Sequence, residues 1–139
     1  SLIGPADVVD IASFDEDGRS GQTVRPGYRS YSYVFIPSMT LQFGPNQSRL
    51  DAAALAKLES FAVLLRAHGF TRMIAVGHDP GPAGPYRLGR LRAEATTSAL
   101  GDLLTISMAS RSAGNQSPVA SNATEAGRSA NRRVELGVG

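Results

Sequence analysis

The chain has 139 residues, no cysteine, a net charge of +2 and a mean hydropathy of −0.12. This length favours one domain with one core, and the lack of cysteine excludes disulfides and thiolate chemistry. No apolar run approaches the roughly 18 residues of a membrane-spanning helix, so the domain itself is not expected to span a membrane. The basic residues other than Lys57 are arginines, scattered with few aromatic neighbours, so we expect no nucleic-acid partner.

The N-terminal quarter has the weakest pattern. Residues 1–37 are interpreted as a partly ordered N-terminal extension, followed by a domain over residues 38–139. Alternation of apolar side chains predicts extended segments over 31–36 and 39–43. Pro37 separates these two segments.

The next segment changes to a helical period. Apolar residues recur along one stripe from Ser48 to His68, with Ser48 as the predicted N-cap and Gly69 as the predicted stop. A short buried strand over 71–76 follows.

Helical and extended segments also alternate in the second half of the chain. A loop rich in glycine and proline over 77–87 precedes a predicted helix over 88–104 and a predicted strand over 106–110. Residues 111–130 are predicted to form a long loop with at most a short helix, and 132–138 to form a closing strand. The order predicts an α/β sandwich, with two helices packed on one face of a mixed sheet of about four strands.

Catalytic and metal sites have no support in the sequence. The two histidines, His68 and His78, do not combine with other residues at zinc-ligand spacing. The chain also contains no G-x-S-x-G turn and no Walker or dinucleotide-binding glycine loop. We therefore expect no enzyme activity, no metal and no cofactor.

One arginine interrupts the apolar stripe of the second predicted helix. At 100° per residue, Arg92 falls in a sector of roughly 120° that faces the core. That sector also contains Leu88, Leu91, Ala95, Ala99 and Leu103. Arg90 and Glu94 lie on the opposite side, spaced as an exposed pair.

A guanidinium in such a position requires a partner, because its desolvation is costly. One interpretation is an internal salt bridge, for example to Asp79 or Glu135, or a side chain that reaches solvent at the helix end. The other is a pocket in which Arg92 and helix N-terminal amides receive a carboxylate while Asp79 receives an ammonium. Such a pocket suits a zwitterion.

The end of the chain carries the most specific pattern. Residues 118–135 form a loop of small and polar residues that runs into Asn131-Arg132-Arg133-Val134-Glu135. This block resembles the closing signature of OmpA-like domains, the peptidoglycan-binding modules of bacterial cell envelopes. Residues 77–79 and 88–93 are similar to the family motifs G-H-T-D and L-S-x-x-R-A. The resemblance covers residues 38–138.

The resemblance implies a fold and a ligand. OmpA-like domains bind the peptide stem of peptidoglycan non-covalently, gripping the charged groups of diaminopimelate. Carried over to this chain, Asp79 is expected to bind the ammonium and Arg92 the carboxylate. Main-chain groups near Phe43 and Gly44 are expected to assist them.

The binding loop departs from the family pattern. The threonine of G-H-T-D is missing and the loop is shorter, while Arg87 and Gly89 replace the family's Asn and Ser. Arg87 and Leu88 complete the predicted ligand-binding set, but Arg87 also offers Asp79 a competing partner. Both pairings of Asp79 are open at this point.

The sequence therefore supports two functions. The first is a module that anchors an envelope protein or machine to peptidoglycan. The second is an OmpA-like scaffold subunit of a secretion, pilus or motility complex that has lost this binding and docks through residues 1–37. Either predicts a periplasmic or cell-envelope location, with a membrane tether in a segment preceding Ser1.

Overall fold

The computed structural model describes residues 10–15, 30–81, 85–115 and 118–139. Its elements, in chain order, are β1 (Asp10–Asp15), β2 (Ser30–Phe35), the 3-10 turn η3 (Pro37–Met39), β3 (Leu41–Gln42), α1 (Ala52–His68), β4 (Arg72–His78), α2 (Pro85–Gly101), β5 (Ser107–Gly114), α3 (Glu125–Asn131) and β6 (Arg133–Val138).

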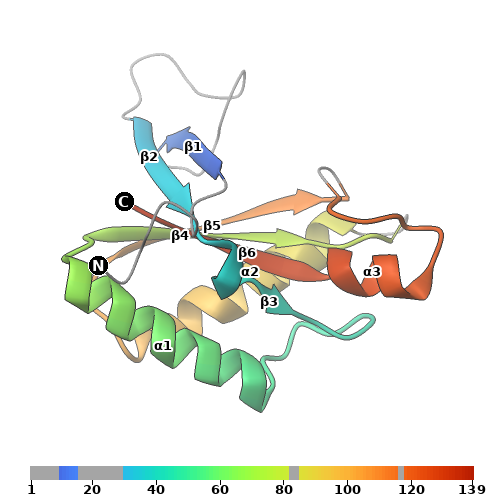
Figure 1. Cartoon of the computed structure of the whole chain (residues 1–139), viewed down its shortest axis with the longest axis horizontal. Helices are drawn as coiled ribbons and strands as arrows, with labels where there is room; N and C mark the ends of the chain where they lie inside the picture. The colour runs from blue at the N-terminus through green and yellow to red at the C-terminus, as the bar shows by residue number, and fades with distance from the viewer. Residues whose placement is uncertain (1–9, 16–29, 82–84, 116–117) are drawn as a thin grey trace.

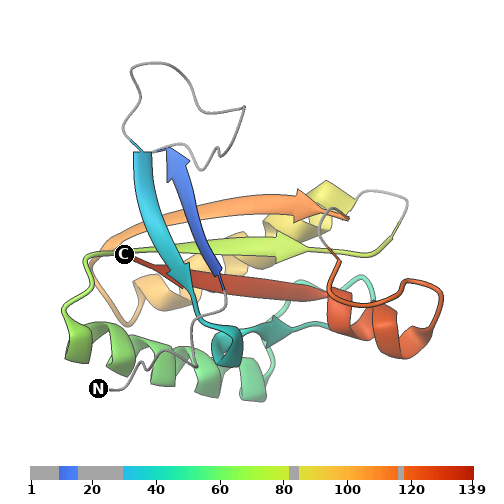
Figure 2. The same ribbon diagram turned by 45° about the horizontal axis from the view of Figure 1, so that its top comes forward.

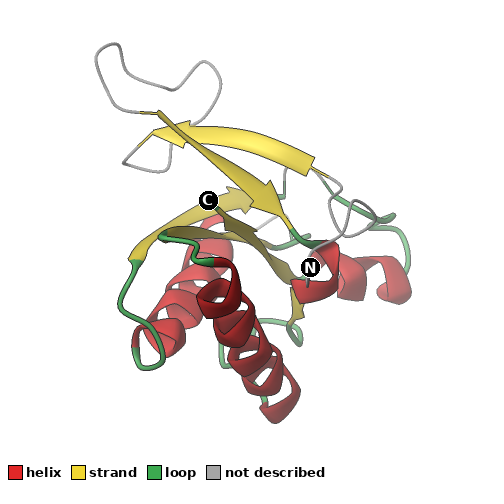
Figure 3. Ribbon diagram, turned by 60° about the vertical axis from the view of Figure 1, so that its left-hand side comes forward, coloured by secondary structure: helices red, strands yellow, loops and turns green. Residues whose placement is uncertain are grey.

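The described strands form one mixed sheet. Its strand order is β1-β2-β6-β4-β5, and β3 pairs with β6. β4 and β5 are parallel, whereas the other pairs are antiparallel. The long helices α1 and α2 lie on one face (Figures 1 and 3). The predicted α/β sandwich is therefore confirmed, and the sheet has more strands than expected because β1 joins it.

Each face of the sheet has its own apolar cluster. The main core lies between the sheet and the helices, where alternate residues of β6 contribute Val134, Leu136 and Val138. The second cluster consists of Tyr33, Ile74 and Val76, with Phe35, Ala109 and Ala113 packed against it. The alternation along β4 and β6 thus sends one set of side chains to each face.

Capping residues determine where α1 begins and ends. Gly69 ends the helix as predicted, in the left-handed conformation with φ of 68°. The predicted N-cap, Ser48, is wrong: Asp51 caps the helix, and its carboxylate accepts from the backbone N–H of Ala54 at 2.8 Å. Asp51 is as good a cap as serine, so composition does not distinguish the two positions.

The buried face of α2 is rotated from the predicted stripe. The residues enclosed on this helix are Gly89, Arg92, Ala93, Thr96 and Leu100. Leu103 lies beyond the helix end and is 40% exposed, because α2 begins at Pro85 and ends at Gly101 rather than spanning 88–104. Arg92 nevertheless faces the core, and Arg90 and Glu94 form the expected exposed pair at 3.6 Å.

The N-terminal strands form a hairpin that extends past the sheet (Figure 2). β1 pairs with all six residues of β2, but β2 reaches β6 only through Val34 and Phe35. Tyr33 and Ile36 are buried in the two clusters. The boundary between an extension and a domain at residues 37 and 38 stays a prediction. In the part of the chain that the structure describes, no helix has the length and apolar composition to cross a membrane.

Candidate ligand-binding site

The guanidinium of Arg92 is completely buried and held by four acceptors. Nη1 donates to Oδ1 of Asp79 at 2.6 Å and to the carbonyl of His78 at 2.8 Å. Nε donates to the carbonyl of Gln47 at 2.8 Å, and Nη2 to that of Gly44 at 3.2 Å. Burial lowers the pKa of Arg92, while the neighbouring Asp79 acts in the opposite direction. This side chain therefore joins the loop before α1, the end of β4 and the body of α2.

Two glycines bring α2 close enough for this arrangement. A Cβ atom on Gly77, near the end of β4, would collide with the backbone carbonyl of Gly89 in α2. A Cβ atom on Gly89 would collide with Ser112 Oγ and would lie 2.7 Å from the carbonyl oxygen of Gly77. No side chain fits at this crossing, so the helix backbone lies directly against the strand. Arg92, about one turn after Gly89, then comes under the end of β4.

Asp79 faces Arg92, which answers the question that the sequence leaves open. Its side chain is almost completely buried, Oδ2 accepts from the backbone N–H of Gly81 at 2.9 Å, and its own N–H donates to the carbonyl of Gly114 at 2.9 Å. Arg87 is exposed on the first turn of α2 and forms no ion pair with any described residue. Leu88, beside it, is half buried.

Phe43 and Gly44 also lie at this site. The Phe43 ring centroid is 5.3 Å from Cζ of Arg92, within the range of a cation–π contact. The Phe43 backbone is paired with Arg132, whose carbonyl accepts from the Phe43 N–H at 2.9 Å and whose Nε donates to the Phe43 carbonyl at 3.1 Å. Nη2 of Arg132 lies 2.7 Å from Oε1 of Glu125. The predicted residues Asp79, Arg92, Phe43 and Gly44 are thus brought together.

Sequence reasoning missed three parts of this arrangement. Arg132 was noted only as part of the closing signature, although it fixes the end of β3. Gln47 and His78 contribute backbone carbonyls, and a carbonyl leaves no signal in residue identity. The excess of arginine in the chain was the one available hint for Arg132.

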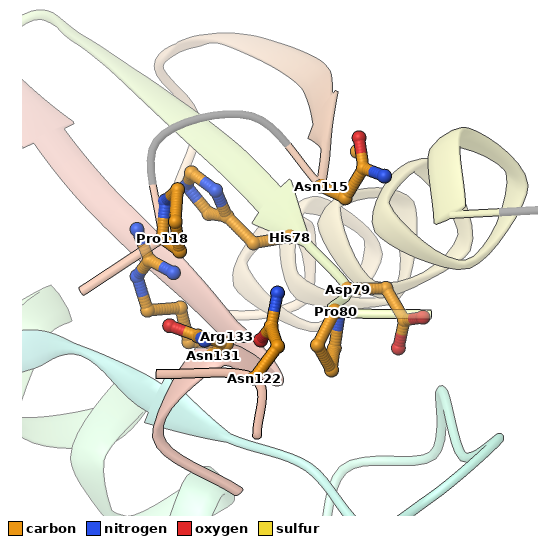
Figure 4. Close-up of a pocket in the computed structure, with 9 residues that line it drawn as sticks. His78, Asp79, Pro80, Asn115, Pro118, Asn122, Asn131 and Arg133 are labelled. Atoms are coloured by element: carbon orange, nitrogen blue, oxygen red, sulfur yellow. Dashed lines mark hydrogen bonds between the residues drawn. The ribbon is translucent and has the colours of Figure 1, made fainter. Parts of the chain in front are cut away.

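A second polar cluster lies on the opposite face of the sheet. Nε2 of His78 is 2.6 Å from Oε1 of Glu135, and Nη2 of Arg133 is 3.3 Å from the same oxygen. Burial raises the pKa of Glu135, but His78 and Arg133 outweigh it and hold that pKa below its ordinary value. His78 and Arg133 line a small pocket with Asp79, shown in Figure 4. The Asp79–Arg92 site and this second polar cluster therefore both lie at the end of β4.

This cluster predicts a pH-dependent contribution to stability. Because the folded-state pKa of Glu135 lies below the ordinary value of 4.5, its stabilising effect is present above that value and is lost as the pH falls through the folded pKa. We expect Glu135→Gln to lower the free energy of unfolding at neutral pH, and the difference from wild type to shrink in acid. Urea unfolding of both proteins, at neutral pH and in acid, measures the difference in the free energy of unfolding. Glu59→Gln, at an exposed position, is the control, and a difference that stays constant in acid contradicts the assignment.

No metal centre is formed in the part of the chain that the structure describes. Within these residues, no group of three or more His, Asp or Glu side chains is placed to hold an ion.

Comparison with known proteins identifies the fold. No family model and no curated protein sequence matches the chain. The structure of the peptidoglycan-associated lipoprotein from Burkholderia pseudomallei is similar, with 27% identity, a TM-score of 0.66, and coverage of 72% of this chain and 89% of that one. The OmpA-like domain of FopA1 from Francisella tularensis matches with 16% identity, a TM-score of 0.63, and coverage of 77% and 72%.

A third similar structure is the cell wall anchor of the T6SS from Pseudomonas aeruginosa. It shares 27% identity, with a TM-score of 0.54 and coverage of 77% of this chain and 80% of that one. The chain therefore has an α/β sandwich fold of the OmpA-like type. The resemblance carried by its closing block is confirmed at the level of the fold.

Proposed function

We propose that this domain is a non-covalent peptidoglycan-binding module that anchors an envelope protein or machine to the cell wall. The observation that carries the proposal is the buried Asp79–Arg92 pair at 2.6 Å, next to the backbone of Phe43 and Gly44. The same residues are expected to bind diaminopimelate from the family resemblance. The similar structures include a peptidoglycan-associated lipoprotein and a cell wall anchor, and both support the hypothesis of a peptidoglycan-binding module.

The chemistry of the pair suits a zwitterionic ligand. Five N–H groups are available on a guanidinium, and Arg92 uses four of them in the contacts above. The remaining N–H belongs to Nη2, which lies against the exposed loop at Gly44. A ligand that displaces this loop presents its carboxylate to Nη2 and its ammonium to Asp79. The contact between Nη1 and Asp79 is retained, and the ligand adds two charge-assisted contacts, one at Nη2 and one at Asp79.

Co-sedimentation with purified sacculi tests the proposal. Asp79→Asn keeps the size of the side chain but removes the charge that an ammonium needs, so we expect the bound fraction to fall to background. Asp102→Asn, at an exposed position after α2, is the matched control and is expected to bind like wild type. Thermal melting of each variant separates lost binding from lost folding. Full binding by a folded Asp79→Asn variant contradicts the site.

A scaffold function is the second candidate, and one observation favours it. Asp79 and Arg92 satisfy each other within the domain, and the Arg92 side chain is 0% exposed, so the pair is complete without a ligand. A wild-type domain that stays in the supernatant with sacculi, yet co-purifies with an envelope complex, supports the scaffold and overturns the anchor. Both candidates place the domain in the cell envelope and neither is an enzyme. Release of muropeptides by the pure protein contradicts that last point.

A further inference from the structure

Arg132 binds the backbone immediately before the loop that contacts Arg92. The junction of α3 and β6 lies beside the end of β3, where β3 pairs with β6 (Figure 1). Phe43 extends this pairing, because its N–H donates to the carbonyl of Arg132 and its own carbonyl accepts from Nε of Arg132. The next carbonyl, that of Gly44, accepts from Nη2 of Arg92. Two guanidinium groups therefore donate to two consecutive carbonyls of this segment.

The guanidinium of Arg132 has donors that no described residue uses. Its side chain is 8% exposed, Nε donates to Phe43, and Nη2 donates to Oε1 of Glu125 at 2.7 Å. A guanidinium has five N–H groups, so both N–H groups of Nη1 and one of Nη2 have no acceptor within the described part of the chain. Donors so far withdrawn from water gain most from a charged acceptor, and a carboxylate matches the planar guanidinium. Arg132 therefore offers a second position for an acidic group beside the ligand site.

The ion pairs around this segment leave positive charge in excess. Glu125 pairs with Arg132 at 2.7 Å and with Arg128 at 3.2 Å, and Asp79 is the partner of the remaining arginine, Arg92. Two carboxylates thus face three guanidinium groups. Burial is the main cause of the lowered pKa of Arg92, and the positive charge of Arg132 acts in the same direction. A zwitterion is neutral and leaves the excess in place, whereas a ligand with one more carboxylate balances it.

We infer that Arg132 binds a second carboxylate of the ligand, so that the site selects stem peptides in which the main-chain carboxyl of diaminopimelate is free. Diaminopimelate has two carboxyl groups. One belongs to the zwitterion that contacts Asp79 and Arg92 in the proposed function, and the other either continues the stem or ends it. Where it ends the stem, it is charged and accepts from Nη1 of Arg132. The inference rests on the proposed function and deepens it, because it names the form of the stem that the site prefers.

Calorimetric titration with two synthetic stem tripeptides tests this inference. Both end on diaminopimelate, one with a free main-chain carboxylate and the other with the same group as an amide. Wild type is expected to bind the free carboxylate about tenfold more tightly, the lower end for a hydrogen bond to a charged group. Arg132→Gln is expected to reduce this preference to within about twofold. Arg132→Lys is expected to be intermediate, because lysine keeps the charge without the planar fork. Arg66→Gln, at an exposed arginine of α1, is the control and is expected to keep the preference of wild type.

A substitution of Glu125 separates carboxylate binding from a structural role of Arg132. Glu125 is 63% exposed, and its carboxylate competes with the ligand for the Arg132 guanidinium. Glu125→Gln removes this competing charge, so we expect the preference for the free carboxylate to rise by about two- to fivefold, the range of an exposed ion pair. If Arg132 serves only to hold Phe43, this substitution leaves the preference unchanged.

Several outcomes overturn the inference. Equal binding of the two peptides by wild type removes the second carboxylate contact and leaves the proposed function standing. An equal loss of affinity for both peptides in Arg132→Gln assigns Arg132 only the positioning of Phe43. If neither peptide binds wild type, the proposed function fails and this inference fails with it. If thermal melting shows that Arg132→Gln does not fold, Glu125→Gln decides: a raised preference supports the inference, and an unchanged or lowered one rejects it.

Discussion

Arg92→Ala is expected to lower the free energy of unfolding by about 3–5 kcal/mol, the usual cost of removing one partner from a buried ion pair. The substitution leaves the carboxylate of Asp79 buried without its counter-charge. It also removes the donors that satisfy the carbonyls of Gly44, Gln47 and His78. Urea unfolding at neutral pH measures the effect.

Arg90→Ala provides the matched control on the same helix. Arg90 is 65% exposed and pairs with Glu94 only at the surface, so its removal is expected to cost less than about 1 kcal/mol. Arg92→Lys keeps the charge, but a lysine side chain lacks the planar guanidinium that reaches four acceptors. Its loss in free energy of unfolding is therefore expected to lie between those of the two alanine variants. Equal stability of the two alanine variants contradicts the role given to Arg92.

Gly77→Ala is expected to destabilise the fold by about 3 kcal/mol, at the upper end for over-packing. The added methyl group meets the backbone of Gly89 rather than a flexible side chain, so neither element yields without separating α2 from β4. That separation also withdraws Arg92 from the end of β4. Chemical denaturation measures the loss, and binding to sacculi is expected to fall with it.

Gly101→Ala is the control for this glycine. Gly101 is the last residue of α2, and a Cβ atom there has nothing within 4 Å. The change is expected to be neutral or to stabilise by up to about 1 kcal/mol, because alanine restricts the unfolded chain. A Gly77→Ala variant as stable as wild type contradicts the close contact between α2 and β4.

Patterns that depend on one element were predictable from the sequence. The apolar period identified α1 and α2, and the position of Arg92 within that period indicated a buried guanidinium. The sequence suggested two ion-pair partners for Arg92, Asp79 and Glu135, and the structure shows that the partner is Asp79. These predictions needed only the spacing of residues along the chain.

Features that depend on tertiary contact were not predictable. The carbonyls that bind Arg92 come from Gly44, Gln47 and His78, and their arrangement follows from the crossing of Gly77 with Gly89. Pairing of β1 with β2 is a non-local contact, and its alternation is too weak to reveal a strand in isolation.

The most direct test of the central claim is competition by free diaminopimelate in the sacculus co-sedimentation assay. If Asp79 and Arg92 bind the charged groups of this residue, adding it releases wild-type protein into the supernatant in a concentration-dependent manner. Lysine serves as the comparison, because it carries only one zwitterionic centre. Protein that remains on sacculi at every concentration of diaminopimelate, or that lysine releases equally well, contradicts the account.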